Sequence, residues 1–544
     1  MGKLTRRISQ RFPTSSTLVA LCAVVLLGTT SHAAVVPNAL FGDHAVLQQG
    51  IAIPVWGTAD KGESITVTFD GETKSTKADR QGRWMVEFGL REAGGPHTLT
   101  IAGKNTIELE DVMVGEVWVC SGQSNMAWTV RRSAKPNTEI AAAQWPGIRM
   151  FTVKRTVAGE PQENVEGSWE TCSSETVPNF SAVGYYFGRD LHQMLEVPVG
   201  MIHTSWGGTP SDAWTRREKL ESTGDLYERR FAMWKKALEE FPEKNEEYLE
   251  KRRAYRQARE YLQDSEREVR VLDERFGSPR ARDVSIASLA PRPRGPRGPN
   301  HSHRPAGLYN GMIAPLIPYA IRGAIWYQGE SNAGRAHQYR TLFPLMIENW
   351  REDWKQGDFP FYWVQLANFQ DTKDEPGESS WAELREAQSM ALKLPNTGQA
   401  VIIDIGEAMD IHPKNKQDVG RRLARIALAQ TYGREMTYSG PVYQGMSVKD
   451  EKVRLTFKHS GGGLVAPGGE LKGFSVAGAD SQFVWASAEI EGDEVVVWSD
   501  EVEKPIAVRY GWAHNPVCNL YNKVGLPASP FRTDDWPGVT VGRN

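Results

Sequence analysis

The sequence GEVWVCSGQSNM, residues 115–126, decides the fold. Its apolar run Val117–Cys120 is typical of a buried strand, and the small polar residues after it are typical of a turn. A strand that ends in such a turn can present a serine hydroxyl at the edge of an α/β sheet, near backbone amides that bind an oxyanion. Ser124 is therefore a candidate nucleophile. The alternative is a plain turn or helix N-cap, which favours the same residue types.

Apolar runs alternate with helix-like stretches through the middle of the chain. Further apolar runs lie at Val197–Thr204, Gly323–Tyr327, Phe361–Leu366 and Gln399–Ile405. Helical periodicity marks Val183–Leu195, His337–Trp354, Trp381–Leu392 and Lys416–Tyr432. This alternation predicts an α/β fold in which parallel strands form a doubly wound sheet. Ligands bind at the carboxyl ends of the strands in such sheets, so the residues that follow each strand belong together.

Four segments that follow the expected strands carry side chains or backbone groups suited to catalysis. They contain Ser124, Gly207–Gly208, Gln328–Asn332 and Asp410–His412. Paired glycines let a backbone amide approach a ligand closely, and side-chain amides donate hydrogen bonds. An imidazole with a nearby carboxylate suits a general base and the group that orients it. Each segment alone also fits a turn or a helix cap, but together they predict one catalytic site at one edge of the sheet.

Both ends of the chain are expected to form β domains. Short alternating runs separated by Gly, Asp and Asn turns fill about 34–113, and similar runs fill 435–544. Both patterns predict sandwich-like domains on either side of the α/β domain at 114–434. Three tryptophans of the C-terminal part either pack in its core or form a flat platform for sugars. They are Trp485, Trp498 and Trp512.

An insertion interrupts the α/β domain at 216–304. Its first part is dominated by Glu, Lys and Arg with Tyr, Leu and Ala between them, which predicts long solvated helices. The sequence RPRGPRGPNHSHRP at 292–305 is too rich in Pro and Gly for regular structure and predicts a mobile loop. The insertion is either a lid or partner-binding arm beside the site, or a tolerated surface segment.

Residues 1–33 have the features of a signal peptide. Four basic residues precede the apolar run Leu18–Gly28, and the small residues up to Ala33 suit cleavage. We therefore expect an exported protein, periplasmic or extracellular, with a retained anchor as the alternative. The rest of the chain has no second run of about 18 apolar residues, so we expect no membrane span in the mature chain.

Composition argues against several kinds of partner and cofactor. The net charge is −3 over 544 residues, whereas a nucleic-acid partner would need a basic face. Without Cys22 of the signal, three cysteines remain, which do not make a disulfide framework. His301 and His303 lack the further spaced ligands of a metal site. We expect no metal and no organic cofactor, and the sequence leaves the oligomeric state open.

Four sequence blocks resemble those of the sialate O-acetylesterase family, which belongs to the SGNH hydrolases. They are GQSNM at 122–126, SWGGTP at 205–210, WYQGESN at 326–332 and DIHPKNK at 410–416. The sequence PAGLYNGMIAPL at 305–316 resembles the family's usual lead-in to the third block. The resemblance implies an SGNH-type doubly wound parallel sheet between two β-sandwich-like domains. It also implies that Ser124 is the nucleophile and His412 the general base.

The resemblance leaves two roles open. It implies an oxyanion hole made of the Ser124 amide, an amide of Gly207 or Gly208, and a side-chain donor. The third block differs from the usual G-x-N-D pattern, and we prefer Gln328, which is nearest the strand end, with Asn332 second. The usual Asp three residues before the histidine is Met409 here. We therefore take Asp410 as the acid, with Asp404, Glu407 or a backbone carbonyl as alternatives. Further candidates for substrate contact are Gln123, Asn125, Glu330 and Trp214.

The function implied by the resemblance is a secreted carbohydrate O-acetylesterase. It would hydrolyse O-acetyl esters of sialic acid or related sugars through a serine acyl-enzyme, without a cofactor. The alternatives are a polysaccharide acetylesterase that acts on acetylxylan or pectin, and a glycan-binding protein whose hydrolase-like domain is inactive.

Overall fold

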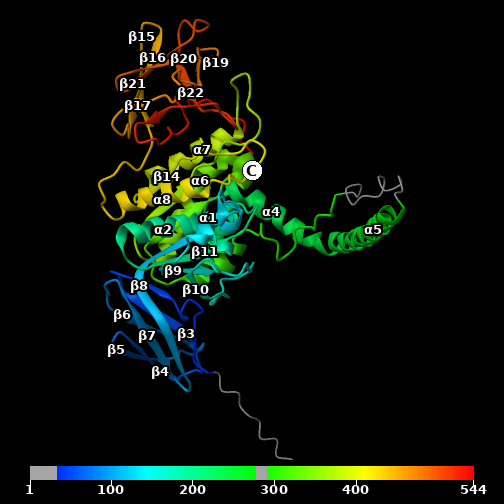
Figure 1. The fold of residues 1–544 in the computed structure, drawn as a ribbon, viewed down its shortest axis with the longest axis vertical. Helices are drawn as coiled ribbons and strands as arrows, with labels where there is room; N and C mark the ends of the chain where they lie inside the picture. The colour runs from blue at the N-terminus through cyan, green and yellow to red at the C-terminus, as the bar shows by residue number, and fades with distance from the viewer. Residues whose placement is uncertain (1–33, 277–290, 544) are drawn as a thin grey trace, which may run out of the picture.

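The computed structural model describes residues 34–276 and 291–543, so the predicted signal peptide lies outside the described residues. A large mixed sheet forms the middle of the molecule (Figure 1). Its strand order is β10-β9-β11-β8-β12-β13-β14, and only the edge strand β10 runs antiparallel to its neighbour in this order. In that order the strands are Trp169–Cys172, Trp145–Thr152, Val199–Ser205, Thr106–Gly122, Gly323–Tyr327, Phe361–Val364 and Thr397–Ala400. The predicted α/β class is confirmed.

Helices cover both faces of this sheet. Helices α2 (Ala182–Leu195) and α8 (Lys416–Gln430) cover one face, whereas α6 (Ala336–Trp354) and α7 (Ser380–Met390) cover the other. Successive side chains of a strand point to opposite faces, so Val117 and Val119 pack with α6 while Trp118 and Cys120 pack with α2. A strand buried on both faces must be apolar throughout. This requirement explains the uninterrupted run that begins the quoted stretch.

The predicted strand at Gln399–Ile405 runs five residues past the end of the observed strand. Strand β14 ends at Ala400. The Arg422 guanidinium donates to the Val401 carbonyl at 2.7 Å and binds both carboxylate oxygens of Asp404 at 2.6 and 2.7 Å. A side chain of α8 thus replaces the neighbouring strand as the partner of this segment. The chain leaves the sheet there and forms the loop that carries His412.

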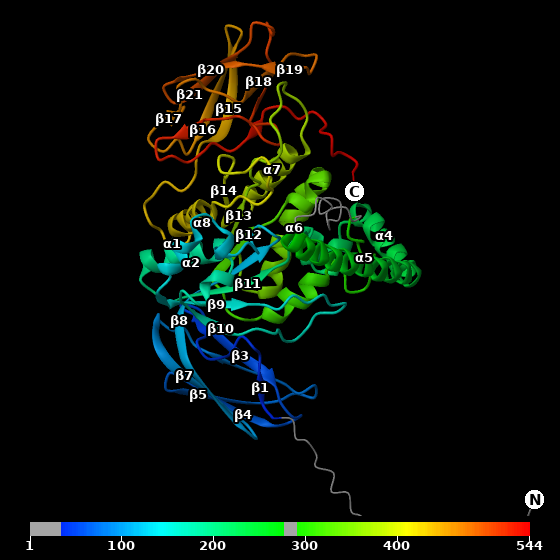
Figure 2. The ribbon, with the colours of Figure 1, turned by 45° about the vertical axis from the view of Figure 1, so that its right-hand side comes forward.

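The N-terminal β region is continuous with the central sheet through β8. Strands β2 (Val46–Gln48) and β7 (Gly94–Ala102) pair with the first part of β8, and β11 and β12 pair with its second part. The predicted boundary between 113 and 114 therefore falls inside one strand. Figure 2 shows β8 passing from the lower β region into the centre. The remaining strands of this region are β1 (Val36–Pro37), β3 (Ile53–Thr58), β4 (Ser64–Phe69), β5 (Glu72–Lys77) and β6 (Arg83–Phe88).

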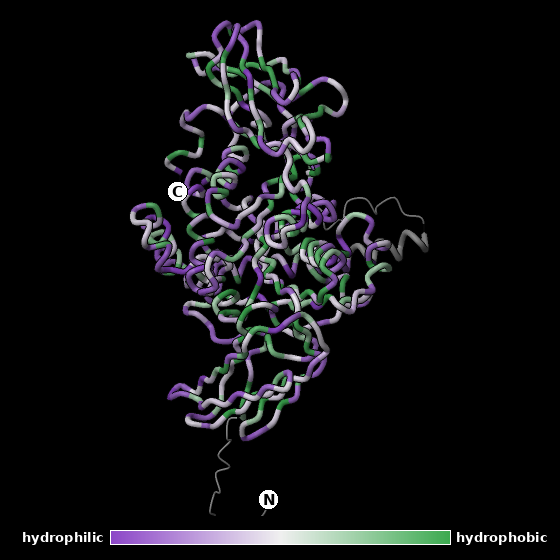
Figure 3. Tube along the Cα trace, turned by 90° about the vertical axis from the view of Figure 1, so that its left-hand side faces the viewer, coloured by the Kyte–Doolittle hydropathy of each residue, from purple (hydrophilic) through white to green (hydrophobic). Residues whose placement is uncertain are grey.

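The C-terminal region contains two four-stranded antiparallel sheets that share one hydrophobic core. One sheet is β15 (Val442–Lys449), β16 (Lys452–Lys458), β21 (Glu494–Trp498) and β20 (Ser487–Glu491). The other is β19 (Phe483–Trp485), β18 (Phe474–Ala477), β22 (Ala507–Tyr510) and β24 (Phe531–Arg532). The short strands β17 (Leu464–Val465) and β23 (Tyr521–Asn522) pair beside them. Along strands at both ends of the molecule, hydrophobic and hydrophilic residues alternate (Figure 3), as expected where one face is buried.

The insertion forms helices, and its longest helix projects from the body of the molecule (Figure 1). These helices are α3 (Arg217–Glu221), α4 (Asp225–Glu239) and α5 (Phe241–Phe276). Ion pairs one turn apart, such as Lys251 with Glu247, lie along α5. Residues 291–305, which include the predicted loop 292–305, contain no helix or strand, and residues 277–290 lie outside the described residues. Helix α4 is tied to the body by Arg230, whose Nη2 lies 3.3 Å from Asp212 Oδ2.

The remaining short helix, α1 (Pro136–Ala141), precedes β9. In the described ranges, no helix is both long enough and apolar enough to cross a membrane. The same ranges contain no group of three or more His, Cys, Asp or Glu side chains that could hold a metal ion.

Candidate active site

Three strand ends meet at the site. In the parallel register, Gly122 of β8 lies beside Ser205 of β11 and Tyr327 of β12. Gly122 has φ +135°, and a Cβ at this position would lie 2.2 Å from the Tyr327 carbonyl oxygen. Only glycine fits such a turn. The close approach brings the residues after β8 directly against the loops that follow β11 and β12.

Ser124 and His412 are in hydrogen-bond contact. The distance between Ser124 Oγ and His412 Nε2 is 2.9 Å, although 288 positions separate the two residues. The Trp128 indole stacks on the imidazole with ring centroids 4.8 Å apart and an interplanar angle of 17°. Burial lowers the pKa of His412, and the Asp410 carboxylate opposes this shift in part. The imidazole is therefore neutral at neutral pH and can accept the Ser124 proton.

Of the three acidic candidates, only Asp410 contacts the imidazole. Asp410 Oδ1 lies 3.1 Å from His412 Nδ1 and also accepts the His412 backbone N–H at 2.9 Å. Burial alone would raise the pKa of Asp410, but these hydrogen bonds hold it below its usual value. Asp404 instead pairs with Arg422, and Glu407 accepts the backbone N–H of Lys414.

We expect Asp410→Asn to lower kcat by roughly 10- to 100-fold. Loss of a buried triad aspartate costs about 10⁴-fold, but the Asp410 side chain is 40% exposed, so water screens part of its effect. Because the carboxylate raises the pKa of His412, its loss lowers that pKa further. The acid limb of the kcat profile should therefore move to lower pH. Glu407→Gln is the control and should behave as wild type; equal profiles for both variants would mean that another group orients the imidazole.

The backbone of the loop after β11 packs against Ser124. A Cβ added to Gly207 would lie 3.2 Å from the Ser124 Cβ. The Trp206 N–H donates to the Gly122 carbonyl at 3.1 Å, which fixes this loop against the turn after β8. Gly208 has φ +73° and is exposed. Of the two glycines, Gly207 is the one in contact with the proposed nucleophile.

The structure reverses our preference between the two amide side chains. Gln328 is fully buried, and its Nε2 donates to the Thr209 carbonyl at 3.2 Å and to Asn332 Oδ1 at 2.7 Å. Its amide hydrogens are therefore already in use. Asn332 Oδ1 also accepts the Ser211 N–H at 3.0 Å, but the buried Asn332 Nδ2 has no protein partner within the described residues. A buried donor without a partner is costly, so Asn332 is the better candidate for an oxyanion donor.

The other four candidates for substrate contact are hydrogen-bonded to other residues of the chain. Trp214 is fully buried, and its indole donates to Thr209 Oγ1 at 3.0 Å. Gln123 Oε1 accepts the Ser331 N–H at 3.3 Å. Asn125 Nδ2 donates to Glu330 Oε1 at 2.6 Å. These residues support the walls of the site, and the prediction that they contact substrate is wrong for the buried Trp214.

Lys416 is a buried residue of the site that the sequence analysis did not single out. It is fully buried, its Nζ donates to Asn125 Oδ1 at 2.5 Å, and burial lowers its pKa to about 7. Asn125 Nδ2 also donates to the Ile411 carbonyl at 3.0 Å. Asn125 follows the proposed nucleophile and Ile411 precedes the proposed base. This network therefore joins the two loops that must stay in register.

Comparison with known proteins places the chain in a family. A family profile described as "Carbohydrate esterase, sialic acid-specific acetylesterase" matches residues 114–247 and 301–429. The crystal structure of a carbohydrate acetylesterase from Xanthomonas citri is similar to the chain with a TM-score of 0.75 and 37% identity. That match covers 92% of this chain and 100% of the other. The chain belongs to the sialic acid-specific acetylesterase family of carbohydrate esterases.

Curated members of the esterase family from mammals are similar over nearly the whole chain. The sialate O-acetylesterase of Rattus norvegicus is 29% identical over 528 residues, 88% of this chain and 90% of its own. That of Homo sapiens is 28% identical over 539 residues, 89% of this chain and 90% of its own. The predicted family is thus confirmed, and the chain is an esterase of the hydrolase class. Ser124, Gly207, Asn332 and His412 all lie within the ranges that the family profile matches.

Proposed function

We propose that the protein removes O-acetyl groups from carbohydrates through an acetyl-enzyme on Ser124. The observation that carries this proposal is the 2.9 Å contact between Ser124 Oγ and His412 Nε2 at the edge of the parallel strands. A nucleophile in hydrogen-bond reach of a base, which is in turn held by a third group, is the arrangement that acyl transfer needs. An inactive glycan-binding domain would have no use for this arrangement.

Catalysis then proceeds in two steps. His412 takes the Ser124 proton while Oγ attacks the acetyl carbonyl carbon. The amides of Ser124 and Gly207 and the Asn332 side chain donate hydrogen bonds to the developing oxyanion. When the tetrahedral intermediate collapses, the ester C–O bond breaks and His412 gives the proton to the departing sugar oxygen, which leaves as a hydroxyl. Water then attacks the acetyl-enzyme with His412 as base again, which releases acetate and restores Ser124.

We also assign the central sheet to the SGNH hydrolase type and propose that the protein is exported. The strand order with parallel neighbours around β8 supports the first assignment. The basic start, the short apolar run and the small residues within 1–33 support the second. Export would bring the enzyme to carbohydrates outside the cytoplasm.

The proposed function predicts acetate release and a labelled serine. We expect the purified enzyme to release acetate from at least one of O-acetylated sialic acid, acetylxylan and acetylated pectin. A fluorophosphonate, which phosphonylates activated serines with loss of fluoride, should inhibit it and add the mass of the phosphonyl group to the peptide that contains Ser124. The order of rates across the panel identifies the sugar class. Labelling of a different serine, or a lack of acetate release from every ester, would contradict the proposal.

A further inference from the structure

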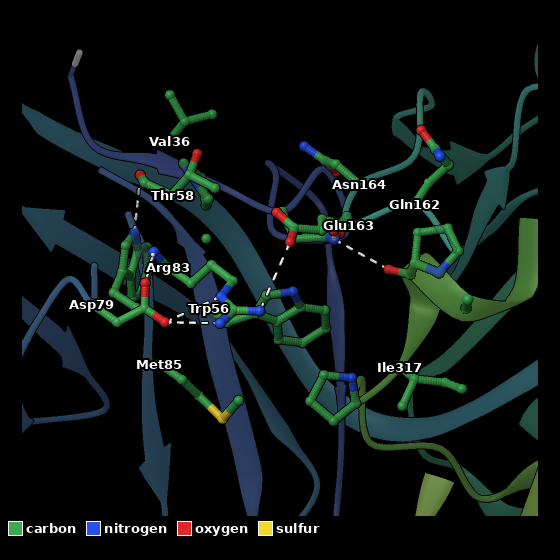
Figure 4. A pocket seen from close by; sticks show the side chains of 17 residues that line it. Val36, Trp56, Thr58, Asp79, Arg83, Met85, Gln162, Glu163, Asn164 and Ile317 are labelled. Carbon is green, nitrogen blue, oxygen red and sulfur yellow. Dashed lines mark hydrogen bonds and ion pairs between the residues drawn. The ribbon is translucent and has the colours of Figure 1, made fainter. Parts of the chain in front are cut away.

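A groove separate from the catalytic site lies between the N-terminal β region and the central domain. Its volume is about 590 Å³, and no residue that lines it belongs to the proposed catalytic machinery. Figure 4 shows Trp56, Arg83 and Met85 of strands β3 and β6 with Glu163, Asn164 and Ile317 of the central part around the same space. Cavities of this size commonly accommodate small organic ligands or single units of a polymer.

The floor of the groove is flat and apolar. Trp56 and Met85 are cross-strand partners in the register of β3 and β6, so their side chains lie on the same face of the sheet. The Trp56 ring packs edge-on against Phe41 at 4.9 Å and lies 6.2 Å from the Tyr319 ring, which holds it in place. Met85 is 49% exposed. A fixed indole beside an exposed thioether offers a surface that suits the C–H face of a sugar ring.

The rim of the groove offers hydrogen bonds, and its charged side chains are one cation and two carboxylates. Arg83 pairs with Asp79 at 3.1 Å and reaches Glu163 across the groove at 4.0 Å. Asn164 Oδ1 accepts the backbone N–H groups of Ala39 and Val165, but the Asn164 Nδ2 has no partner in the described part of the chain. The same is true of the Trp56 Nε1. Because the one cation already faces two carboxylates, the groove does not suit a phosphate or a sugar acid; it suits neutral hydroxyl groups.

One segment connects the groove to the active site. Arg155 Nε donates to the Ser205 carbonyl at 3.2 Å, immediately before the loop that carries Gly207. Residues 162–164 of the same segment line the groove. The nine residues from Arg155 to Glu163 can span at most about 30 Å when fully extended. A polymer of several sugar units is therefore long enough to reach from the groove to the loop after β11.

We propose that this groove binds an unacetylated, neutral stretch of a polysaccharide whose acetylated unit lies at Ser124. The choice of a glycan rests on the proposed function; the groove's chemistry rests on the contacts above. The bound stretch holds the polymer near the catalytic site and raises the effective concentration of its esters there. A short acetyl ester cannot use the groove, so its hydrolysis does not depend on these residues.

The kinetic test compares a polymer with a small ester in three variants. Met85→Ala removes part of the floor, and Asn164→Asp replaces the free amide donor with a carboxylate that can only accept hydrogen bonds. Met194→Ala is the matched control, since Met194 is equally exposed on α2 at 48%. We expect KM for acetylxylan to rise about 5- to 10-fold in the two groove variants. Their hydrolysis of p-nitrophenyl acetate should stay unchanged, and the control should match wild type on both substrates. Unchanged KM values in both groove variants would overturn the proposal.

A binding test separates this inference from the proposed function. Affinity electrophoresis of the full chain with deacetylated xylan or glucomannan needs no ester hydrolysis. Retardation by a neutral polymer that weakens in Met85→Ala and Asn164→Asp supports the groove even if no acetate is released by wild type. Retardation by polygalacturonate alone, competition by inorganic phosphate, or no retardation by either neutral polymer would contradict it.

Discussion

Ser124→Ala and His412→Ala are each expected to lower kcat for an acetyl ester by about 10⁶-fold, and the double variant should be no worse than either single one. The two side chains act as one unit, because Oγ is a weak nucleophile until Nε2, 2.9 Å away, accepts its proton. The measurement is kcat on p-nitrophenyl acetate together with thermal unfolding. The contact between the two side chains is partly exposed, so neither variant should change the unfolding midpoint. A changed midpoint would mean that the substitution also alters the structure.

The control for this pair is His337→Gln, since His337 is an exposed histidine on α6. It should hydrolyse as fast as wild type. Two results would contradict the assignment. One is an active Ser124→Ala variant that unfolds normally; the other is losses for the two single variants that multiply in the double variant, since that would mean that the side chains act independently.

Asn332→Asp is expected to lower kcat by about 10²- to 10³-fold with little change in KM. The aspartate keeps the oxygen that accepts from Ser211 N–H and Gln328 Nε2 at 3.0 and 2.7 Å. It removes the buried Nδ2 donor that has no protein partner in the described ranges. A donor that bonds only the oxyanion stabilises the transition state and not the bound ester, so the loss falls on kcat.

The same chemical change at the exposed Asn164 is the matched control for Asn332→Asp. With p-nitrophenyl acetate as substrate, Asn164→Asp should match wild type. Full activity of the Asn332→Asp variant would exclude Asn332 as the donor. A rise in KM with kcat unchanged would place Asn332 in ground-state binding and not in the oxyanion hole.

The sequence was sufficient to predict the sheet and the pairing of Ser124 with His412. Uninterrupted apolar runs such as Val117–Cys120 identify strands covered on both faces, as observed. Parallel strands end at one edge, so the residues after them could be grouped before any coordinates were known. The end of β14 could not be predicted, because the hydrogen bond that draws Val401 away from the sheet comes from Arg422 of α8.

The roles of polar side chains inside the site were harder to predict. Gln328 and Asn332 lie four positions apart, and sequence position favoured the one nearer the strand. Their roles depend on which amide is already bonded, and those partners, Thr209 and Tyr339, come from other segments. Lys416 lies in a polar stretch that suggests exposure. Its burial could not be predicted, because the partner of its ammonium group is Asn125, which is 291 positions away in the sequence.

The continuity of β8 has a consequence for the order of folding. Antiparallel partners such as β7 precede β8 directly in the chain, so they can pair with it while the rest of the polypeptide is still being synthesised. The C-terminal half of β8 is then available as a template for pairing. Strand β11 (Val199–Ser205) pairs with it next, and β12 (Gly323–Tyr327) pairs with it much later. A truncated protein that starts at residue 114 would keep this half of β8 but lose β2 and β7, which hold the strand in place. We expect it to accumulate as misassembled chains and not as a smaller working enzyme.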